Sequence, residues 1–260
     1  MDSMVSGINR SVSPDLSGLN DSVALQLRDI SHSYGSLQSI QSINLSIRRH
    51  EFVAIVGPSG CGKSTLLSIL SGFIHPASGV IEREGNVRMI YQQGGLFPWM
   101  TVTENISLGL RRLKNKIERL HKLQELITLI GMNGFEQSYP HQLSGGMQQR
   151  VELARALADE TDILLMDEPF SSLDYLTRLK MRWELMRMLN EKPRTVVFVT
   201  HDVEEAVHLA DRVAVLTPRP STIQCEISLL SLPHPRRLSQ TGVVEAARTI
   251  LKEMGLEEEV

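Results

Sequence analysis

The feature that most constrains this chain is a glycine-rich stretch at residues 57–65. It fits the phosphate-binding pattern of a glycine, four residues of any kind, and then Gly-Lys-Ser/Thr, and it reads Gly57, Pro58, Ser59, Gly60, Cys61, Gly62, Lys63, Ser64 and Thr65. An apolar run at 52–56 precedes it and apolar residues within 66–70 follow it, as expected of a buried strand and a helix. Because a chance glycine turn would not need this context, the stretch predicts a loop that binds a nucleoside triphosphate.

The residue types of this loop suit phosphate chemistry. Its glycines let backbone N–H groups converge on phosphate oxygens, and the N-terminus of the following helix adds the positive end of a dipole. Lys63 is expected to reach the β- and γ-phosphates, and the Ser64 hydroxyl is expected to bind Mg²⁺. We therefore expect the nucleotide and the metal ion to bind together.

The composition is that of a soluble globular protein, with 22% charged and 42% hydrophobic residues among 260. The formal net charge of −3 provides no basic field, so no nucleic-acid partner is expected. Cys61 and Cys225 have neither metal nor redox spacing, which indicates a reduced, cytosolic setting. No apolar run approaches the ~20 residues that span a bilayer, and no secretory signal is visible. Membrane association is therefore expected to come through a partner.

The first part of the chain changes character near residue 22. Residues 1–21 are rich in Ser, Asp, Asn and Gly and are expected to form a flexible or loosely docked extension. Residues 23–27 and 40–47 alternate in polarity and are expected to be strands. Between them Tyr34 precedes a glycine, where its ring either stacks on a base or packs against the protein.

A third strand, expected at 87–91, runs into Gln92 and Gln93 and then into an unusually apolar segment at 96–100. That segment is either core or a docking surface, and the sequence does not separate the two. A helix is expected to begin at Thr101 or Thr103 and to lead into one amphipathic helix that ends near Gly131. Its apolar positions are Leu113, Ile117, Leu120, Ile127 and Ile130.

A second glycine-rich stretch, at 143–150, opens a further helix. Ser144, Gly145 and Gly146 lie at the expected N-terminus of this helix, which makes it a possible second anion site. No lysine or metal-binding hydroxyl accompanies these residues as in the first loop. Taken alone, the pattern favours an N-capped helix.

Two carboxylates, Asp167 and Glu168, close the apolar strand expected at 163–166. Successive strand residues point to opposite sides, so the two carboxylates are expected to face different groups. One can hold Mg²⁺, directly or through water, and the other can orient and deprotonate an attacking water molecule.

His201 follows another buried strand, expected at 195–200. Asp202 and Glu205 have capping-box spacing, so a helix is expected to begin just after the histidine. The imidazole would then lie at the carboxyl end of a strand, where open α/β sheets place their ligands. One more strand is expected at 213–216, and a short amphipathic helix is expected near 243–254.

Together these stretches resemble the motifs of the nucleotide-binding subunits of ATP-binding-cassette transporters, over about residues 23–223. The glycine loop matches the Walker A motif, Asp167 and Glu168 close the Walker B motif, and 143–148 matches the family signature. The other matches are Gln92 for the Q-loop glutamine (with Gln93 as the alternative), Ser172, Leu173 and Asp174 for the D-loop, His201 for the switch histidine, and Tyr34 for the aromatic residue that stacks on adenine.

The resemblance implies an α/β fold, namely a P-loop NTPase core with a parallel sheet, an antiparallel β edge subdomain and a helical subdomain. The ATPase domain would span 22–230, with the helical subdomain at about 96–158, and a tail with a short helix would span 231–260. It also implies ATP hydrolysis with Mg²⁺ as cofactor. Glu168 would be the general base, assisted by His201, Lys63 and Gln92, and the metal would be held by Ser64, Gln92 and Asp167.

The resemblance further implies that two cassettes, expected to be identical in sequence, face each other head to tail. ATP on the glycine loop of one chain would be completed by signature and D-loop residues of the other, namely Ser144, Gly145, Gly146, Gln148 and Asp174. Gln148 and Glu152 depart from the residues frequent at their positions, and neither is expected to touch the chemistry.

Residues 96–102 and 216–220 look like those of the importers for nitrate, sulfonates, taurine and related solutes. The expected partners are then membrane permease subunits and an external solute-binding protein, with this chain peripheral on the cytoplasmic face of the cell membrane. Two alternatives have other functions: a soluble mechanochemical or assembly ATPase, and a regulatory module without turnover. The absence of a coiled-coil insertion argues against the first, and intact Lys63, Asp167, Glu168 and His201 argue against the second.

Overall fold

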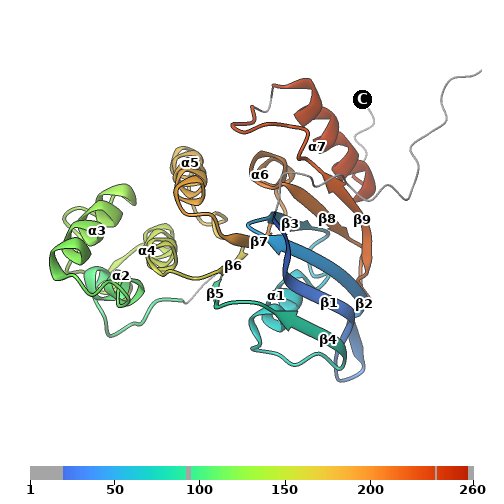
Figure 1. Ribbon diagram of the computed structural model, residues 1–260, viewed down its shortest axis with the longest axis horizontal. Coiled ribbons are helices and arrows are strands. Elements are labelled where there is room, and N and C mark those ends of the chain that lie inside the picture. The colour runs from blue at the N-terminus through green and yellow to red at the C-terminus, as the bar shows by residue number, and fades with distance from the viewer. Residues whose placement is uncertain (1–19, 92–94, 238, 257–260) are drawn as a thin grey trace, which may run out of the picture.

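The computed structural model describes residues 20–91, 95–237 and 239–256 (Figure 1). A six-stranded sheet lies at its centre, in the order β5-β6-β7-β3-β8-β9. The first five strands in this order are parallel, and the edge strand β9 runs antiparallel to β8. The strands are β3 (Phe52–Val56), β5 (Val87–Ile90), β6 (Ile163–Asp167), β7 (Thr195–Val199), β8 (Arg212–Leu216) and β9 (Ile223–Ser228).

The central strands are apolar throughout because both faces of the sheet are covered. In β3 all five residues are buried, and Val53 and Ile55 face one hydrophobic cluster while Phe52, Ala54 and Val56 face the other. This follows from the two-residue period of a strand between two packed layers. The sheet therefore forms a rigid support for the loops at its carboxyl edge.

One face of the central sheet packs against helix α1 (Lys63–Ser71) and a second, antiparallel sheet. That sheet has the order β2-β1-β4, from strands β1 (Asn20–Tyr34), β2 (Leu37–Arg49) and β4 (Ser78–Arg83). The buried residues of β1, β2 and α1 share one hydrophobic cluster with the central strands. Strands β4 and β9 were not among the strands expected from the sequence, because neither shows a buried apolar run.

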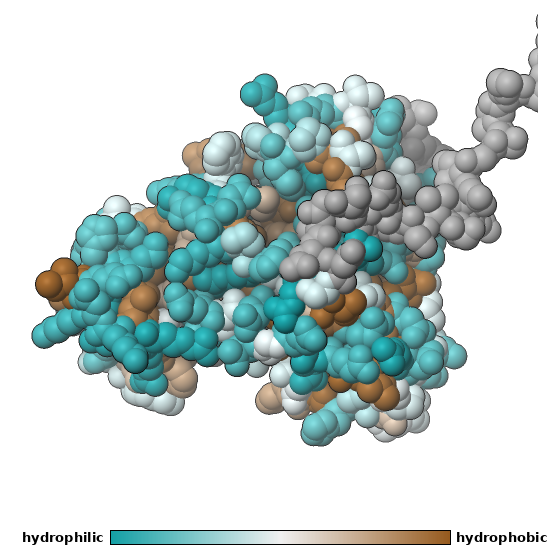
Figure 2. Space-filling model, viewed as in Figure 1, coloured by the Kyte–Doolittle hydropathy of each residue, from teal (hydrophilic) through white to brown (hydrophobic). Residues whose placement is uncertain are grey.

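The other face carries the remaining helices, with α2 and α3 at the opposite end of the molecule from the antiparallel sheet (Figure 1). In Figure 2 the visible face is mainly hydrophilic, and its apolar residues form separate patches. Within the described ranges no helix is both long and apolar enough to cross a bilayer. The helices are α2 (Val102–Gly109), α3 (Lys116–Leu129), a 3-10 turn (Pro140–Gln142), α4 (Gly145–Ala158), α5 (Tyr175–Glu191), α6 (Val203–Leu209) and α7 (Thr241–Glu253).

The single amphipathic helix expected up to Gly131 is wrong, because the structure has two helices there. Thr101 caps α2 through a full capping box, and the Asn115 side chain caps α3 by accepting from two backbone N–H groups. This second cap starts a new helix with its own orientation. Ile117 and Leu120, expected on the apolar face, are 80% and 56% exposed, whereas Leu123, Leu126, Ile127 and Ile130 form the buried face.

The fold class expected from the sequence is confirmed: a parallel α/β core, an antiparallel β subdomain and a group of helices inserted between β5 and β6. The domain limits stay predictions. Apart from the first two residues of β1, the extension expected at 1–21 lies outside the described residues.

Candidate functional site

Sheet order brings three of the expected motifs to one edge. Strands β6, β7 and β3 are direct, parallel neighbours, so their carboxyl ends lie side by side. The glycine loop follows β3, the two carboxylates close β6, and His201 follows β7. Residues more than a hundred positions apart in sequence thus meet at the edge where α/β proteins bind ligands.

The glycine loop has the backbone form that an anion site needs. Gly60 and Gly62 have φ values of +74° and +113°, which L side chains rarely adopt. Gly62 is the N-cap of α1 and leaves the first N–H groups of the helix without a side-chain cap. These donors are thus available for phosphate oxygens, in the field of the helix dipole.

Lys63 is buried and bonded to its own loop. Its Nζ donates to the carbonyl oxygens of Gly57 at 2.7 Å and Pro58 at 3.0 Å. A phosphate that enters the loop would offer the ammonium a charged acceptor in place of two neutral ones. Tyr34, which the resemblance assigns to adenine stacking, is half-exposed and lies near α1. Its hydroxyl is 3.4 Å from Oγ1 of Thr65 in that helix.

Asp167 and Ser64 lie in contact across the site. The Asp167 carboxylate is buried, and burial raises its pKa, while a hydrogen bond with the Ser64 side chain acts in the opposite direction. A hydroxyl oxygen beside a carboxylate oxygen fits the ligand set of Mg²⁺, which takes one or two protein ligands and completes its shell with water and phosphate. No group of three or more His, Cys, Asp and Glu side chains within the described residues forms a metal cage.

Glu168 points the other way, toward the histidine. Its Oε1 lies 3.1 Å from Nδ1 of His201. Its backbone has a φ of +45°, a strained conformation for a residue with a side chain. The strain is held on both sides, because its N–H donates to the carbonyl of Val199 and its carbonyl accepts from Ser171 and Gln149. The neighbouring carboxylates therefore face different partners. Glu168 follows the last residue of β6, so its direction is set by this positive φ and not by the strand alternation on which the expectation was based.

Gln149 is a site residue that the sequence did not reveal. Its Nε2 donates to the Glu168 carbonyl at 3.1 Å, and its Oε1 accepts from the backbone N–H and the hydroxyl of Ser172. One side chain of α4 thus fixes both the carboxylate-bearing turn and the turn before α5. Its neighbour Gln148, matched to the signature, instead donates to the carbonyls of Pro140 and Leu143.

In the described part of the chain, the start of α4 is bonded to its own helix and to the turns around it, not to the glycine loop of its own chain. Ser144 caps the helix by accepting from the backbone of Met147, and Gly145 has open space beside it. At Gly146 an added Cβ would lie 3.0 Å from the Ser172 carbonyl oxygen. Across the described ranges no hydrogen bond joins 144–148 to 57–65. Asp174, the last of the D-loop residues, caps α5 by accepting from Thr177.

Gln92, matched to the Q-loop, and its alternative Gln93 lie outside the described residues. The residues that flank them are held by α4. The buried Glu152 carboxylate accepts from the Tyr91 N–H at 3.0 Å, and the carbonyl of Gly95 accepts from the Arg155 guanidinium. Burial raises the pKa of Glu152, and hydrogen bonds from these two backbones oppose the rise. Glu152, for which the sequence suggested no role, therefore contacts Tyr91 and Gly95, the described residues on either side of the expected Q-loop.

The segment at 96–100 divides into a fixed backbone and exposed rings. The buried Asn105 holds the backbone, accepting from the Phe97 N–H and donating to the carbonyls of Phe97, Met100 and Thr101. Trp99 is nevertheless 68% exposed and lies against the Phe97 ring. This arrangement favours a docking surface over core, because a packed segment would bury its largest side chain.

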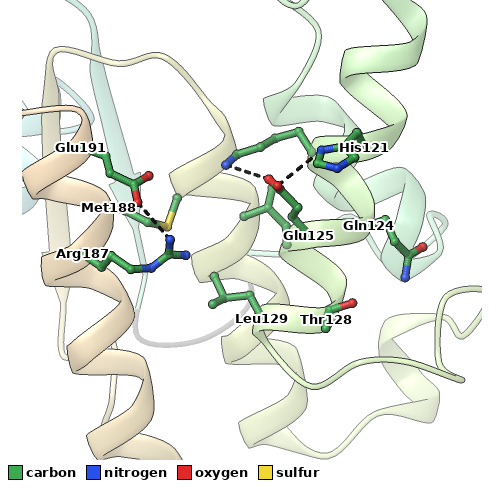
Figure 3. Close-up of a pocket in the computed structure, with 10 residues that line it drawn as sticks. His121, Gln124, Glu125, Thr128, Leu129, Arg187, Met188 and Glu191 are labelled. Carbon is green, nitrogen blue, oxygen red and sulfur yellow. Dashed lines mark hydrogen bonds and ion pairs between the residues drawn. The ribbon is translucent and has the colours of Figure 1, made fainter.

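A surface cavity of ≈ 660 Å³ lies between α3 and α5, away from the glycine loop (Figure 3). Its charged side chains are paired with one another, Glu125 with His121 and Lys122, and Arg187 with Glu191. Because these partners satisfy one another, the cavity offers no convergent charge to a phosphate. Size alone does not identify the site, and the chemistry lies at the carboxyl edge of the sheet.

Comparison with known proteins shows the family to which the chain belongs. The family described as ABC transporter matches residues 40–171. The chain is 42% identical over 203 residues to the taurine import ATP-binding protein of Pelagibacter ubique, covering 75% of this chain and 77% of that protein. It is 44% identical over 220 residues to an aliphatic sulfonates import ATP-binding protein of Rhodococcus jostii, covering 82% and 85%.

Solved structures give the same result. The chain resembles a dimeric bacterial ABC transporter cassette with a TM-score of 0.71 and 31% identity, over 79% of this chain and 98% of that one. The same values relate it to a dimeric, post-hydrolysis ATP-binding cassette bound to ADP and Pi.

Proposed function

The chain belongs to the ABC transporter family as an ATP-hydrolysing cassette subunit, and from this premise we propose that it powers import of a small solute of the sulfonate, taurine or nitrate class. The observation that carries the proposal is the meeting of Lys63, the Ser64–Asp167 contact and the Glu168–His201 pair at one edge of the sheet. These are the parts that phosphoryl transfer to water requires.

Glu168 acts as the general base. Its carboxylate can accept a proton from a water molecule held between it and the γ-phosphate, and His201, bonded to it through Nδ1, keeps the carboxylate aimed. The strained backbone at Glu168 fixes the direction of this side chain before substrate arrives. Positioning is the main contribution a protein makes to phosphoryl transfer, because little covalent chemistry is left to it.

Lys63 neutralises charge on the transferred group. On ATP binding its ammonium exchanges the Gly57 and Pro58 carbonyls for phosphate oxygens. Ser64 and Asp167 would hold Mg²⁺, with Gln92 as a further ligand, and Tyr34 would stack on adenine. The bound ion supplies positive charge to the β- and γ-phosphate oxygens.

The site is completed by a second copy of the chain. Ser144, Gly145 and Gly146 form an uncovered helix start that lies apart from its own glycine loop, and the related cassettes are dimeric. A head-to-tail pair places this helix start over the partner's γ-phosphate, with Gln148 and Asp174 beside it. Hydrolysis then requires the closed pair, so that turnover and closure are linked.

Closure drives the transport step through a membrane permease. The exposed Trp99 and Phe97, on a backbone fixed by Asn105, provide an apolar surface for it beside the expected Q-loop. The chain would then be peripheral on the cytoplasmic face of the cell membrane, and an external solute-binding protein would deliver the solute. A soluble assembly ATPase is not favoured by relatives that are named as import proteins.

The test begins with affinity capture of the tagged full-length chain from membranes of its own cells. We expect an integral membrane permease among the captured proteins. The complex, placed in proteoliposomes with the matching binding protein, should take up taurine or an alkanesulfonate only when ATP is present on the side of the membrane that carries the cassettes. Nitrate serves as the comparison solute. Capture of a soluble scaffold without a permease, or ATP hydrolysis without uptake of any of these solutes, would contradict the proposal.

A further inference from the structure

An ionic cluster of two buried and two partly exposed side chains joins the helix after the D-loop turn to the helix after His201. Arg178 and Arg182 lie one turn apart on α5, so they share a face of that helix. Asp202 is the N-cap of α6 and Glu205 lies in its first turn, and both face these arginines. Two positive and two negative groups therefore meet between α5 and α6, next to the histidine of the site.

The two arginines are held very differently. Arg182 makes a close contact, with Nη2 at 2.5 Å from Glu205 Oε1 and 3.2 Å from Asp202 Oδ2. Arg178 lies farther away, at 3.7 Å from Asp202 and 4.0 Å from Glu205, both beyond hydrogen-bond distance. Its Nη2 instead donates a hydrogen bond, at 3.2 Å, to the carbonyl of Leu173 in the turn before α5.

The cluster also lacks acceptors for two buried donors. Within the described residues, Nε of Arg178 and Nε of Arg182 are buried without a hydrogen-bond partner. Buried donors in native proteins are nearly always paired, so an under-satisfied cluster calls for a reason. A cluster with a spare donor can adopt a second arrangement in which Arg178 moves closer to the carboxylates while it leaves Leu173.

Both acidic residues of the cluster are hydrogen-bonded to the side chain of Thr200, the residue before His201. The Thr200 hydroxyl donates to Glu205 at 2.7 Å, and the Asp202 N–H donates to that hydroxyl at 3.0 Å. His201 lies between these two residues and contacts Glu168. The backbone on both sides of His201 is thus fixed by groups that belong to the cluster.

We propose that Arg178 is a positioning residue that transmits the position of the D-loop turn to His201. The turn at 171–174 lies against Gly146 and is hydrogen-bonded to Gln149. A partner cassette that presses on this turn would therefore displace the Leu173 carbonyl oxygen, which accepts a hydrogen bond from Arg178. Arg178 then shifts toward Asp202 and sets the imidazole opposite Glu168. This inference rests on the proposed function, because it takes the force on the turn from cassette pairing.

The first experiment needs no turnover. In the full-length protein without nucleotide, Arg178→Gln should shift the ring resonances of His201 in a histidine-selective NMR spectrum, while the unfolding midpoint stays close to that of wild type. Arg187→Gln is the matched control, because Arg187 lies farther along α5 and pairs with Glu184 and Glu191 on the surface. Unchanged His201 resonances in Arg178→Gln would overturn the proposal even if the chain proves not to be a transporter subunit.

The second experiment measures coupling in hydrolysis. Arg178→Gln should lower kcat at least tenfold with KM for ATP within twofold of wild type, whereas a general loss of structure would also move KM and the unfolding midpoint. In a His201→Ala background the same change should lower kcat less than twofold, because Arg178 acts through His201. An equal tenfold loss in both backgrounds would overturn the proposal. A wild-type chain without ATPase activity would instead contradict the proposed function.

Discussion

The Glu168 carboxylate lies 3.1 Å from Nδ1 of His201, on a backbone turned to a φ of +45°. This contact orders the carboxylate before any nucleotide is bound. It directs Glu168, the proposed general base, away from Asp167, whose carboxylate is hydrogen-bonded to Ser64 at the proposed metal site. The two neighbouring acids therefore have distinct partners, as the two roles proposed for them require.

Glu168→Gln should lower the rate of ATP hydrolysis by about 10²- to 10⁴-fold, the usual contribution of a general base. ATP affinity should stay within about twofold, since glutamine keeps the shape of the side chain. A phosphate-release assay and an ATP-binding titration measure both, and light scattering should detect an ATP-stabilised dimer. Glu204→Gln, on the exposed side of α6, is the control. Near-normal hydrolysis by Glu168→Gln would remove Glu168 from this role.

Lys63→Ala should weaken ATP binding by about 10- to 100-fold. Hydrogen bonds to charged groups contribute about 1.5–3 kcal/mol, and each 1.4 kcal/mol is a factor of ten in affinity. Calorimetric titration with Mg-ATP checks this, with the exposed Lys114→Ala as the matched change. Unaltered affinity in Lys63→Ala would show that the ammonium stays on the Gly57 and Pro58 carbonyls when nucleotide binds.

Gly146→Ala should destabilise the chain while Gly145→Ala does not. An added Cβ at Gly146 would meet the Ser172 carbonyl, which Gln149 prevents from moving, whereas the space beside Gly145 is open. Both changes replace glycine by alanine in the same helix and gain the same helix propensity. The difference between their free energies of unfolding therefore measures the cost of crowding at Gly146, which we expect to be about 1–3 kcal/mol. Urea unfolding of both variants without nucleotide measures it. Equal stabilities of the two variants would show that the turn at Ser172 moves to make room for the added Cβ and that the contact costs nothing.

The stability of the chain should fall as the pH drops from about 7 to 5, in part because of His208. Burial lowers the pKa of this histidine, and the nearby Arg182, His234 and Arg236 lower it further. The unfolded chain then binds a proton at a pH where the folded chain does not, so stability is present above the ordinary histidine pKa and is lost as the pH falls below it.

His208→Gln should reduce this pH dependence, which urea unfolding at several pH values between 5 and 7.5 can measure. The exposed His75→Gln provides the comparison and should follow wild type. A pH dependence that is the same in all three proteins would exclude His208 as its source.

The parts of the site that could be predicted from the sequence are those written in short, contiguous motifs. The glycine loop, the acids after β6 and the cap at Asp202 each contain their chemistry within a few residues, and the parallel order of the strands then brings them together. The helix break at Asn115 was missed because the apolar spacing continues across it. Within this continuous apolar spacing, the only local sign that a new helix begins is the N-cap residue Asn115.

The supporting residues were not predictable, because their partners are distant in the chain. Gln149 bonds to Glu168 and Ser172, and Arg178 bonds to Leu173 while it faces Asp202. Nothing in their local sequence distinguishes them from ordinary polar helix residues. The sequence marks Glu152 only as an unusual residue at its position, and its contact with Tyr91 depends on how α4 lies against β5.

The close approach of Gly146 to Ser172 limits which pieces of this protein can be exchanged with those of a relative. The inserted helices look like a separable unit. However, Gly146 of the insertion lies so close to the carbonyl of Ser172, outside the insertion, that a side chain at this position would crowd it. A chimaera that takes 96–158 from another importer would inherit a helix start fitted to a foreign turn. The natural unit of exchange is therefore longer than the insertion and reaches through Asp174.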